Sequence, residues 1–167
     1  MNYSIKLLPS ELMAIRTHKA WIEFISGFQF QVAATVTVGS HKPQKQQLYM
    51  EPSQASVERR ARHWLNLESR RLDGQRYYRR PCCGLSWIMV AEQGQQHQRW
   101  HAHLLIGWAG GELSEHWCVA AARRWRLLHG NAEIERIRGS YEAAGYASKH
   151  LHRTGDWSVS PQLNTKT

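Results

Sequence analysis

Two histidines separated by one residue are the side chains of this sequence whose type and spacing most directly suggest chemistry. His101 and His103 lie in the mainly apolar segment 100–106, which reads as a β-strand. Side chains two positions apart in a strand project to the same face, so both imidazoles point the same way. Two neutral ring nitrogens held close together form part of a shell for a divalent cation. The structural alternative is a half-exposed strand that happens to carry two of the chain's ten histidines.

A glutamate in the preceding segment is placed to complete this set. Residues 86–92 read as a second strand, and the polar, glycine-containing residues 93–98 predict the loop of a hairpin between the two strands. If Glu92 lies opposite His101 in that hairpin, the two side chains share one face of the sheet. We therefore expect Glu92, His101 and His103 to form a candidate metal site.

A tyrosine and a lysine near the C-terminus form a second pair of reactive side chains. Residues 140–153 predict a helix rich in small residues, in which Tyr146 and Lys149 lie three positions apart on one face. Gly145 inside this helix costs about 1 kcal/mol relative to alanine, which indicates either a close approach of another group to the backbone or a simple kink. A tyrosine near a helix end is usually a core or rim aromatic. The pair alone therefore does not identify a nucleophile.

The charge balance points to a polyanionic partner. The chain of 167 residues has 22 lysines and arginines against 13 aspartates and glutamates, a formal net charge of +9. Nucleic acid is the first candidate for such a partner. No apolar run approaches the ~18 residues of a membrane span, and the N-terminus lacks the apolar core of a secretory signal. We therefore expect a soluble, cytoplasmic protein with no membrane partner.

The most basic segment is a helix predicted from Ser53 to about Leu72. Its buried stripe is apolar, whereas the segment from 59 to 80 contains eight arginines and few acidic residues. An excess of one sign suits contact with the phosphates of DNA, and the alternative is a solvated helix face. The candidate DNA-binding residues are Arg59, Arg60, Arg62, Arg70, Arg71, Arg76, Arg79 and Arg80.

The remaining periodicity predicts alternating helices and strands in one domain. A chain of this length with 42% hydrophobic residues is long enough for one core and short for two. The order of elements predicts an α+β fold, a single domain with a central, mainly antiparallel β-sheet and packed helices. We assign residues 1–27 to an N-terminal helical extension, 28–153 to the main domain and 154–167 to a loose, polar C-terminal tail. The expected elements are helix 10–25, strand 28–38, helix 53–72, a hairpin over 86–108, helix 113–128, strand 132–138 and helix 140–153.

Three segments in this order resemble the motifs of the HUH endonucleases, in particular the single-tyrosine replication-initiator (Rep) proteins of rolling-circle replicons. The apolar, threonine-containing strand Val32–Thr37 resembles the first motif of that family. Trp100–Ile106 resembles its histidine-hydrophobic-histidine motif, and Ala144–Leu151 resembles its tyrosine-x-x-lysine helix. The resemblance covers most of residues 28–153. Many relatives have a second tyrosine directly after the lysine, where this chain has His150, and this difference favours a one-tyrosine mechanism.

The resemblance implies an RRM/ferredoxin-like HUH fold and a metal-dependent enzyme that nicks and rejoins single-stranded DNA. Tyr146 would attack a phosphodiester with the help of Mg²⁺ or Mn²⁺ held by Glu92, His101 and His103, leaving a 5′-phosphotyrosine and a free 3′-hydroxyl. Lys149 would stabilise the phenolate or clamp a phosphate. The implied partner is single-stranded DNA or a DNA hairpin at a replication origin. A host helicase would unwind the duplex, because no helicase segment follows in this sequence.

Three other functions are compatible with these residues. A single-tyrosine transposase of the insertion-sequence type shares the metal motif and the nucleophile, and the DNA flanking the gene would separate it from a replication initiator. A non-catalytic DNA-binding domain with a decayed site would bind DNA without nicking it. A small metal-dependent hydrolase unrelated to DNA would explain the histidines but not the net charge of +9.

Overall fold

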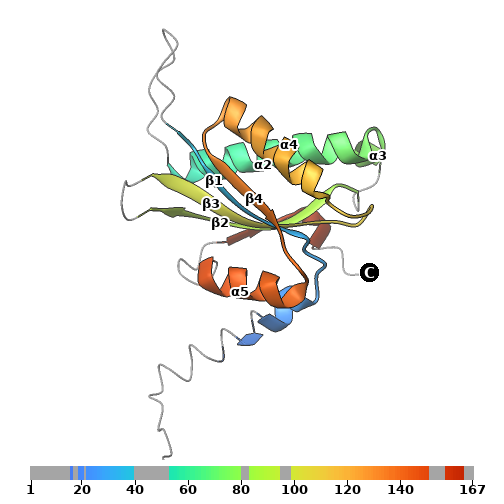
Figure 1. Cartoon of the computed structure of the whole chain (residues 1–167), viewed down its shortest axis with the longest axis vertical. Coiled ribbons are helices and arrows are strands. Elements are labelled where there is room, and N and C mark those ends of the chain that lie inside the picture. The colour runs from blue at the N-terminus through green and yellow to red at the C-terminus, as the bar shows by residue number, and fades with distance from the viewer. Residues whose placement is uncertain are drawn as a thin grey trace, which may run out of the picture.

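An antiparallel sheet of five strands, in the order β4-β1-β3-β2-β5, forms the centre of the molecule (Figure 1). The computed structural model describes residues 22–39, 53–79, 83–94, 99–150 and 157–163, together with residues 16, 19 and 20. The strands are β1 (Val32–Thr37), β2 (Leu85–Gln93), β3 (Trp100–Trp108), β4 (Ala132–Arg136) and β5 (Trp157–Val159).

The connections between the strands confirm the predicted α+β class. Besides the helical residues that precede β1, the helices within the described residues are α2 (Gln54–Asp73), α3 (Arg76–Arg79), α4 (Glu115–Leu128), α5 (Ser140–His150) and the 3-10 helix Pro161–Leu163. The run β1-α2-β2-β3-α4-β4 has the βαββαβ order of a ferredoxin-like fold. None of the helices in the described part of the chain combines the length and the apolar character needed to cross a membrane.

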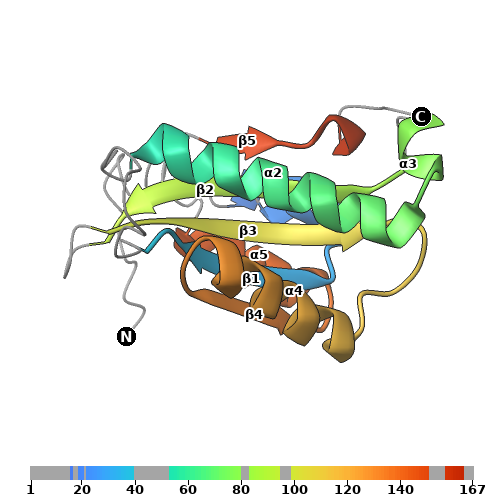
Figure 2. The same cartoon turned by 90° about the horizontal axis from the view of Figure 1, so that it is seen from above.

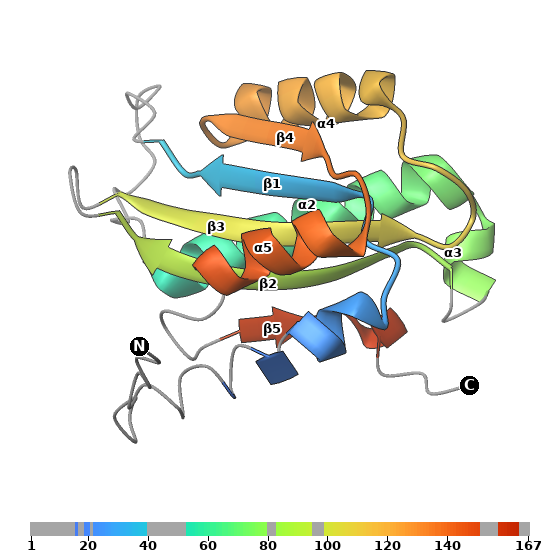
Figure 3. The same cartoon turned by 60° about the horizontal axis from the view of Figure 1, so that its bottom comes forward.

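The sheet has a helical layer on each face, because its central strands are apolar on both sides. Helices α2 and α4 cover one face, and α5 lies against the other (Figures 1 and 2). In β3 the buried side chain of Leu104 packs in the core beneath α2 and α4, whereas its neighbour Leu105 packs in the core on the other face. Figure 3 shows α5 lying across that other face of the sheet. Because side chains alternate along a strand, His103 also faces α5.

Serine caps explain where the two long helices begin. Ser53 precedes α2 and forms a capping box with Ser56, in which each side chain accepts a hydrogen bond from the other residue's backbone N–H. Ser114 caps α4 by accepting a hydrogen bond from the backbone N–H of Trp117 at 3.2 Å. Gly130 ends α4 with a φ of 150°, and a Cβ there would lie 2.4 Å from the carbonyl oxygen of Thr37. Only glycine fits this close approach to β1.

The prediction of a loose C-terminal tail from residue 154 is wrong over residues 157–163. There β5 extends the sheet by pairing with β2, and Trp157 lies opposite Val90. Ser160 then fixes the end of the strand, because its N–H donates to the carbonyl of Trp87 at 2.9 Å and its hydroxyl accepts from the N–H of Trp87 at 3.1 Å. A strand of three residues leaves no periodic signal in the sequence, so pattern reasoning could not find it.

The other boundaries differ from the predictions by a few residues. The first strand runs from 32 to 37 rather than from 28 to 38, and these are the residues that lie in register with β3 and β4. Residues 22–26 are helical, as predicted for helix 10–25, and most of the rest of that helix lies outside the described residues. Residues 151–153, predicted as the end of the last helix, also lie outside them.

Candidate functional site

The hairpin of β2 and β3 places three candidate ligands on one patch of the sheet. Glu92 lies directly opposite His101 in the antiparallel register, as the sequence predicts. Residues opposite each other in such a pair share a face, and His103 shares the face of His101 because it lies two positions further along β3. All three side chains therefore point to the side of the sheet that α5 covers.

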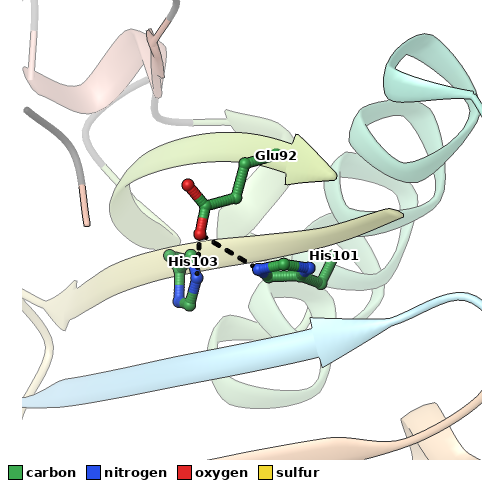
Figure 4. A group of neighbouring side chains, drawn as sticks. All are labelled: Glu92, His101 and His103. Atoms are coloured by element: carbon green, nitrogen blue, oxygen red, sulfur yellow. Dashed lines mark hydrogen bonds and ion pairs between the residues drawn. The ribbon is translucent and has the colours of Figure 1, made fainter. Parts of the chain in front are cut away.

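One carboxylate oxygen joins the two imidazoles (Figure 4). Oε1 of Glu92 lies 3.1 Å from Nε2 of His101 and 3.0 Å from Nε2 of His103. The two rings are almost perpendicular, at 89°, with centroids 4.8 Å apart. Burial acts to raise the pKa of Glu92, but the hydrogen bonds and charges of the two histidines outweigh it and lower this pKa below its usual value. The carboxylate is therefore ionised at neutral pH.

This cluster could hold a metal ion. One ligand atom from each of Glu92, His101 and His103 lies within 4.8 Å of the other two. Two imidazole nitrogens and one carboxylate oxygen are a donor set that binds first-row divalent metals. The side chains of Glu92 and His101 are each 17% exposed and that of His103 is 6% exposed. The cluster thus lies at the edge of the core, where two of its members reach solvent.

Tyr146 of α5 belongs to the same cluster. Its phenol oxygen lies 3.1 Å from Nδ1 of His103, and its hydroxyl donates to the carbonyl of Ala34 at 2.8 Å. His103 therefore contacts Tyr146 through one ring nitrogen and Glu92 through the other. Burial raises the pKa of Tyr146 to about 12, although a hydrogen bond from Thr35 acts in the opposite direction. The phenol is consequently protonated at neutral pH.

Thr35 of β1 completes the contacts and was not predicted as a site residue. Its hydroxyl oxygen lies 3.0 Å from Nδ1 of His103 and 3.1 Å from the oxygen of Tyr146. The register of β1 against β3 places Thr35 directly opposite His103. The signal in the sequence is a pair of threonines, Thr35 and Thr37, at alternate positions of an otherwise apolar strand.

Two expectations for α5 have different outcomes. Lys149 lies one turn after Tyr146 in the helix, but its side chain lies outside the described part of the structure, so its role stays a prediction. The close approach that Gly145 suggested is not found, because a Cβ added there would meet no described atom within 4 Å. Gly145 is exposed instead.

Six of the eight predicted DNA-binding arginines lie on the opposite face of the sheet from the candidate metal ligands. Helix α2 carries Arg59, Arg60, Arg62, Arg70 and Arg71 on the face away from α5, and Arg76 follows in α3. Arg62 pairs with Glu58 at 3.3 Å, and Arg71 pairs with Glu68 at 3.2 Å. The side chain of Arg79 and the whole of Arg80 lie outside the described residues. The structure therefore unites the ligands with the tyrosine but does not bring the α2 arginines to them.

Comparison with protein-family models, curated proteins and solved structures finds no match for this chain.

Proposed function

We propose that this chain is a metal-dependent endonuclease of the HUH type, which nicks and rejoins single-stranded DNA through one tyrosine. Within that class, we propose a rolling-circle replication initiator acting in the cytoplasm. One observation carries the proposal: the imidazole of His103 contacts both Tyr146 and Glu92. Its Nδ1 lies 3.1 Å from the phenol oxygen of Tyr146, and its Nε2 lies 3.0 Å from a carboxylate oxygen of Glu92. The proposed nucleophile, Tyr146, thus contacts one of the candidate metal ligands directly. The net charge of +9 supports a polyanionic substrate.

The cluster offers ligands for the metal that this chemistry needs. Glu92, His101 and His103 would hold Mg²⁺ or Mn²⁺, and the ion would neutralise charge on the scissile phosphate and orient it. The ionised carboxylate of Glu92 supplies the negative charge that retains a divalent cation. His101, which is partly exposed, lies where a substrate strand can approach from solvent.

Tyr146 would form the covalent bond to DNA. Its oxygen attacks phosphorus, the bond from phosphorus to the 3′ oxygen breaks, and the phosphoryl group of the downstream strand stays on the tyrosine. The phenol loses its proton as the bond forms, and the released 3′ oxygen gains one. Because the hydroxyl now donates to the carbonyl of Ala34, which is not a base, it has to leave this carbonyl before it attacks. A later 3′-hydroxyl reverses the reaction and joins the strands.

The proposed partners follow from this chemistry. The substrate is single-stranded DNA or the unpaired part of a DNA hairpin at a replication origin, and a host helicase would supply unwinding. Lys149 would stabilise the developing phenolate or hold a phosphate. An origin hairpin beside the gene would favour replication over transposition, whereas paired element ends would favour a transposase.

The test is a covalent adduct that survives boiling in detergent. The protein is incubated with a library of single-stranded oligonucleotides and Mn²⁺ or Mg²⁺, and adducts are separated by denaturing electrophoresis. We expect an adduct from the wild-type protein that chelation abolishes. We expect none from His101→Ala or His103→Ala, although DNA binding measured by fluorescence anisotropy should persist. Glu92→Gln should be milder, with an altered metal preference, because an amide oxygen can still coordinate.

A matched control is available on the opposite face of the sheet. His116 in α4 is exposed, and His116→Ala should form the adduct as the wild type does. Absence of an adduct from the wild-type protein across the whole library with both metals would contradict the proposal. Undiminished nicking by His103→Ala would instead remove His103 from the ligand set.

A further inference from the structure

We propose that Thr35 is a positioning residue, which fixes the imidazole of His103 for metal binding and connects it to Tyr146. The inference rests on the metal site of the proposed function, but it concerns a residue on a different strand from all three candidate ligands. Thr35 lies in β1 directly opposite His103 of β3. Because β1 pairs with β3 on one side and with β4 on the other, its backbone is held along both edges.

Three polar atoms, one each from Thr35, His103 and Tyr146, form a nearly equilateral triangle. The hydroxyl oxygen of Thr35 lies 3.0 Å from Nδ1 of His103 and 3.1 Å from the oxygen of Tyr146. The third side, from Nδ1 of His103 to the oxygen of Tyr146, is also 3.1 Å. All three distances are within hydrogen-bonding range, so the direction of each hydrogen decides which contacts form.

The backbone carbonyl of Ala34 settles the first direction. A carbonyl oxygen can only accept, so the hydroxyl of Tyr146 donates to it at 2.8 Å. A phenol oxygen can accept a hydrogen bond while its hydrogen is donated, so the oxygen of Tyr146 can also act as an acceptor. Of the other two atoms in the triangle, a threonine hydroxyl can donate and accept at once, whereas an imidazole nitrogen does only one of these.

Metal binding at Nε2 of His103 fixes the remaining directions. Nε2 faces Glu92, and a nitrogen that coordinates a metal uses its lone pair, so the ring hydrogen must sit on Nδ1. Nδ1 then donates to Thr35, and Thr35 donates to Tyr146, which donates to Ala34. Each hydrogen in this chain finds an acceptor. When Nε2 instead donates to Glu92, the hydroxyl of Thr35 turns and donates to Nδ1. Thr35 therefore satisfies His103 in both states.

The experiment distinguishes the effect of the Thr35 hydroxyl group from the effect of the side-chain shape. Thr35→Val keeps the branched shape and removes the hydroxyl, whereas Thr35→Ser keeps the hydroxyl and removes the methyl group. Thr37→Val makes the same change two positions along the strand, where the hydroxyl contacts the backbone of Asn131 rather than the cluster. Mn²⁺ affinity is measured without DNA by electron paramagnetic resonance, and thermal unfolding of each variant checks that it is folded.

We expect Thr35→Val to bind Mn²⁺ about 10–100-fold more weakly than the wild type, as is usual when a hydrogen-bond partner of a metal-binding histidine is removed. Thr35→Ser should recover most of the affinity, and Thr37→Val should match the wild type. Wild-type affinity in Thr35→Val would overturn the proposal. So would Thr35→Ser binding as weakly as Thr35→Val, because the methyl group rather than the hydroxyl would then matter.

A second measurement needs no variant. Nitrogen-15 NMR of the wild-type histidine side chains with Zn²⁺, which is diamagnetic, should show the hydrogen of His103 on Nδ1; a hydrogen on Nε2 in the metal-loaded protein would contradict the proposal. Both readouts are independent of DNA cleavage. Thr35-dependent metal binding in a protein that forms no DNA adduct would reject the nuclease and retain Thr35. Full adduct formation together with unchanged metal affinity in Thr35→Val would retain the nuclease and reject the role of Thr35.

Discussion

One histidine connects the proposed nucleophile to the candidate metal site. His103 contacts Glu92 through Nε2 and Tyr146 through Nδ1. A change in the hydrogen bonding of one ring nitrogen therefore alters the hydrogen bonding of the other. Burial raises the pKa of Tyr146 to about 12, and a phenol with this pKa is a weak nucleophile at neutral pH. If Tyr146 is the nucleophile, its activation must come from its surroundings, and Thr35 is a polar side chain that contacts both Tyr146 and His103.

Gly145 offers a test of the surface beside Tyr146. A Cβ at this position meets no described atom within 4 Å, and alanine is about 1 kcal/mol more favourable than glycine inside a helix. Gly145→Ala should therefore stabilise the protein by about 0.5–1 kcal/mol in urea unfolding. Gly139→Ala is the matched control: φ is +102° there, so alanine should destabilise despite equally open space. A destabilised Gly145→Ala variant would show that this side of the helix is occupied.

Local periodicity explains why the three candidate metal ligands could be found in the sequence, whereas Thr35 could not. The ligand set depends on alternation within one strand and on a short hairpin, in which Glu92 and His101 are nine residues apart. Thr35 is separated from His103 by 68 residues and from Tyr146 by 111. Its contacts depend on how β1 pairs with β3 and on where α5 returns to the sheet, and neither is a local property of the sequence.

At the scale of elements, a buried carboxylate joins the two helices that cover the far face of the sheet. Glu68 of α2 is fully buried, and Arg124 of α4 donates to it with Nε at 2.7 Å and with a terminal nitrogen at 2.5 Å. Trp64 and Trp125 pack edge to face in the same helical layer, with ring centroids 5.6 Å apart. In the sequence Glu68 is only one of the few acidic residues near the basic helix, whereas the structure uses it to fasten α2 to α4.

Removal of Arg124 should therefore destabilise the fold. Arg124→Met leaves a buried carboxylate with only Arg71 as a partner among the described ion pairs, and we expect a loss of about 3 kcal/mol in chemical unfolding. Arg123→Met, one position earlier on the exposed side of α4, should change stability by less than about 0.5 kcal/mol. The double variant Glu68→Met, Arg124→Met should recover much of the loss, because no buried charge is left unpaired. Equal effects of the two single variants would contradict this account of the pair.

The arginines of α2 lie on the opposite face of the sheet from the proposed cleavage site. They can contact the same bound DNA strand only if that DNA passes around the end of the sheet. Figure 2 shows the first turns of α2 at the end where β2 stops and β3 begins, which is where Glu92 and His101 lie. Arg59, Arg60 and Arg62 are in the first half of α2, whereas Arg70 is about 15 Å further along the helix axis. The two groups therefore differ in their distance from the proposed cleavage site.

Salt titration of DNA binding tests this difference. If Arg59, Arg60 and Arg62 bind phosphates, their replacement by alanine should reduce the slope of log affinity against log salt by ~0.7 for each phosphate that is no longer neutralised. Replacement of Arg70 and Arg76, which are exposed at the other end of α2 and in α3, should leave the slope near its wild-type value. An unchanged slope in the first variant would show that the phosphates of the bound DNA lie elsewhere.

At the scale of the whole molecule, the two faces of the sheet differ in what they bury. Among the described residues, the face beneath α2 and α4 contains the larger core, which includes two fully buried tryptophans, Trp64 and Trp125. The opposite face combines a smaller core with the polar cluster and Tyr146. The main strands and helices could be predicted because their apolar periodicity is regular. The edge strand β5 could not, since its three residues acquire their structure only by pairing with β2.

The identity of the nucleophile is the most direct test of the proposed function. Tyr141, at the start of α5, is 91% exposed, whereas the oxygen of Tyr146 lies within hydrogen-bonding distance of His103. The trapped protein–DNA adduct is digested with protease, and the tyrosine that carries the oligonucleotide is identified by mass spectrometry. We predict that the oligonucleotide is on the Tyr146 peptide, that Tyr141→Phe still forms the adduct, and that Tyr146→Phe binds DNA but forms none. An oligonucleotide on the Tyr141 peptide, or an adduct that persists in Tyr146→Phe, would contradict the proposed mechanism.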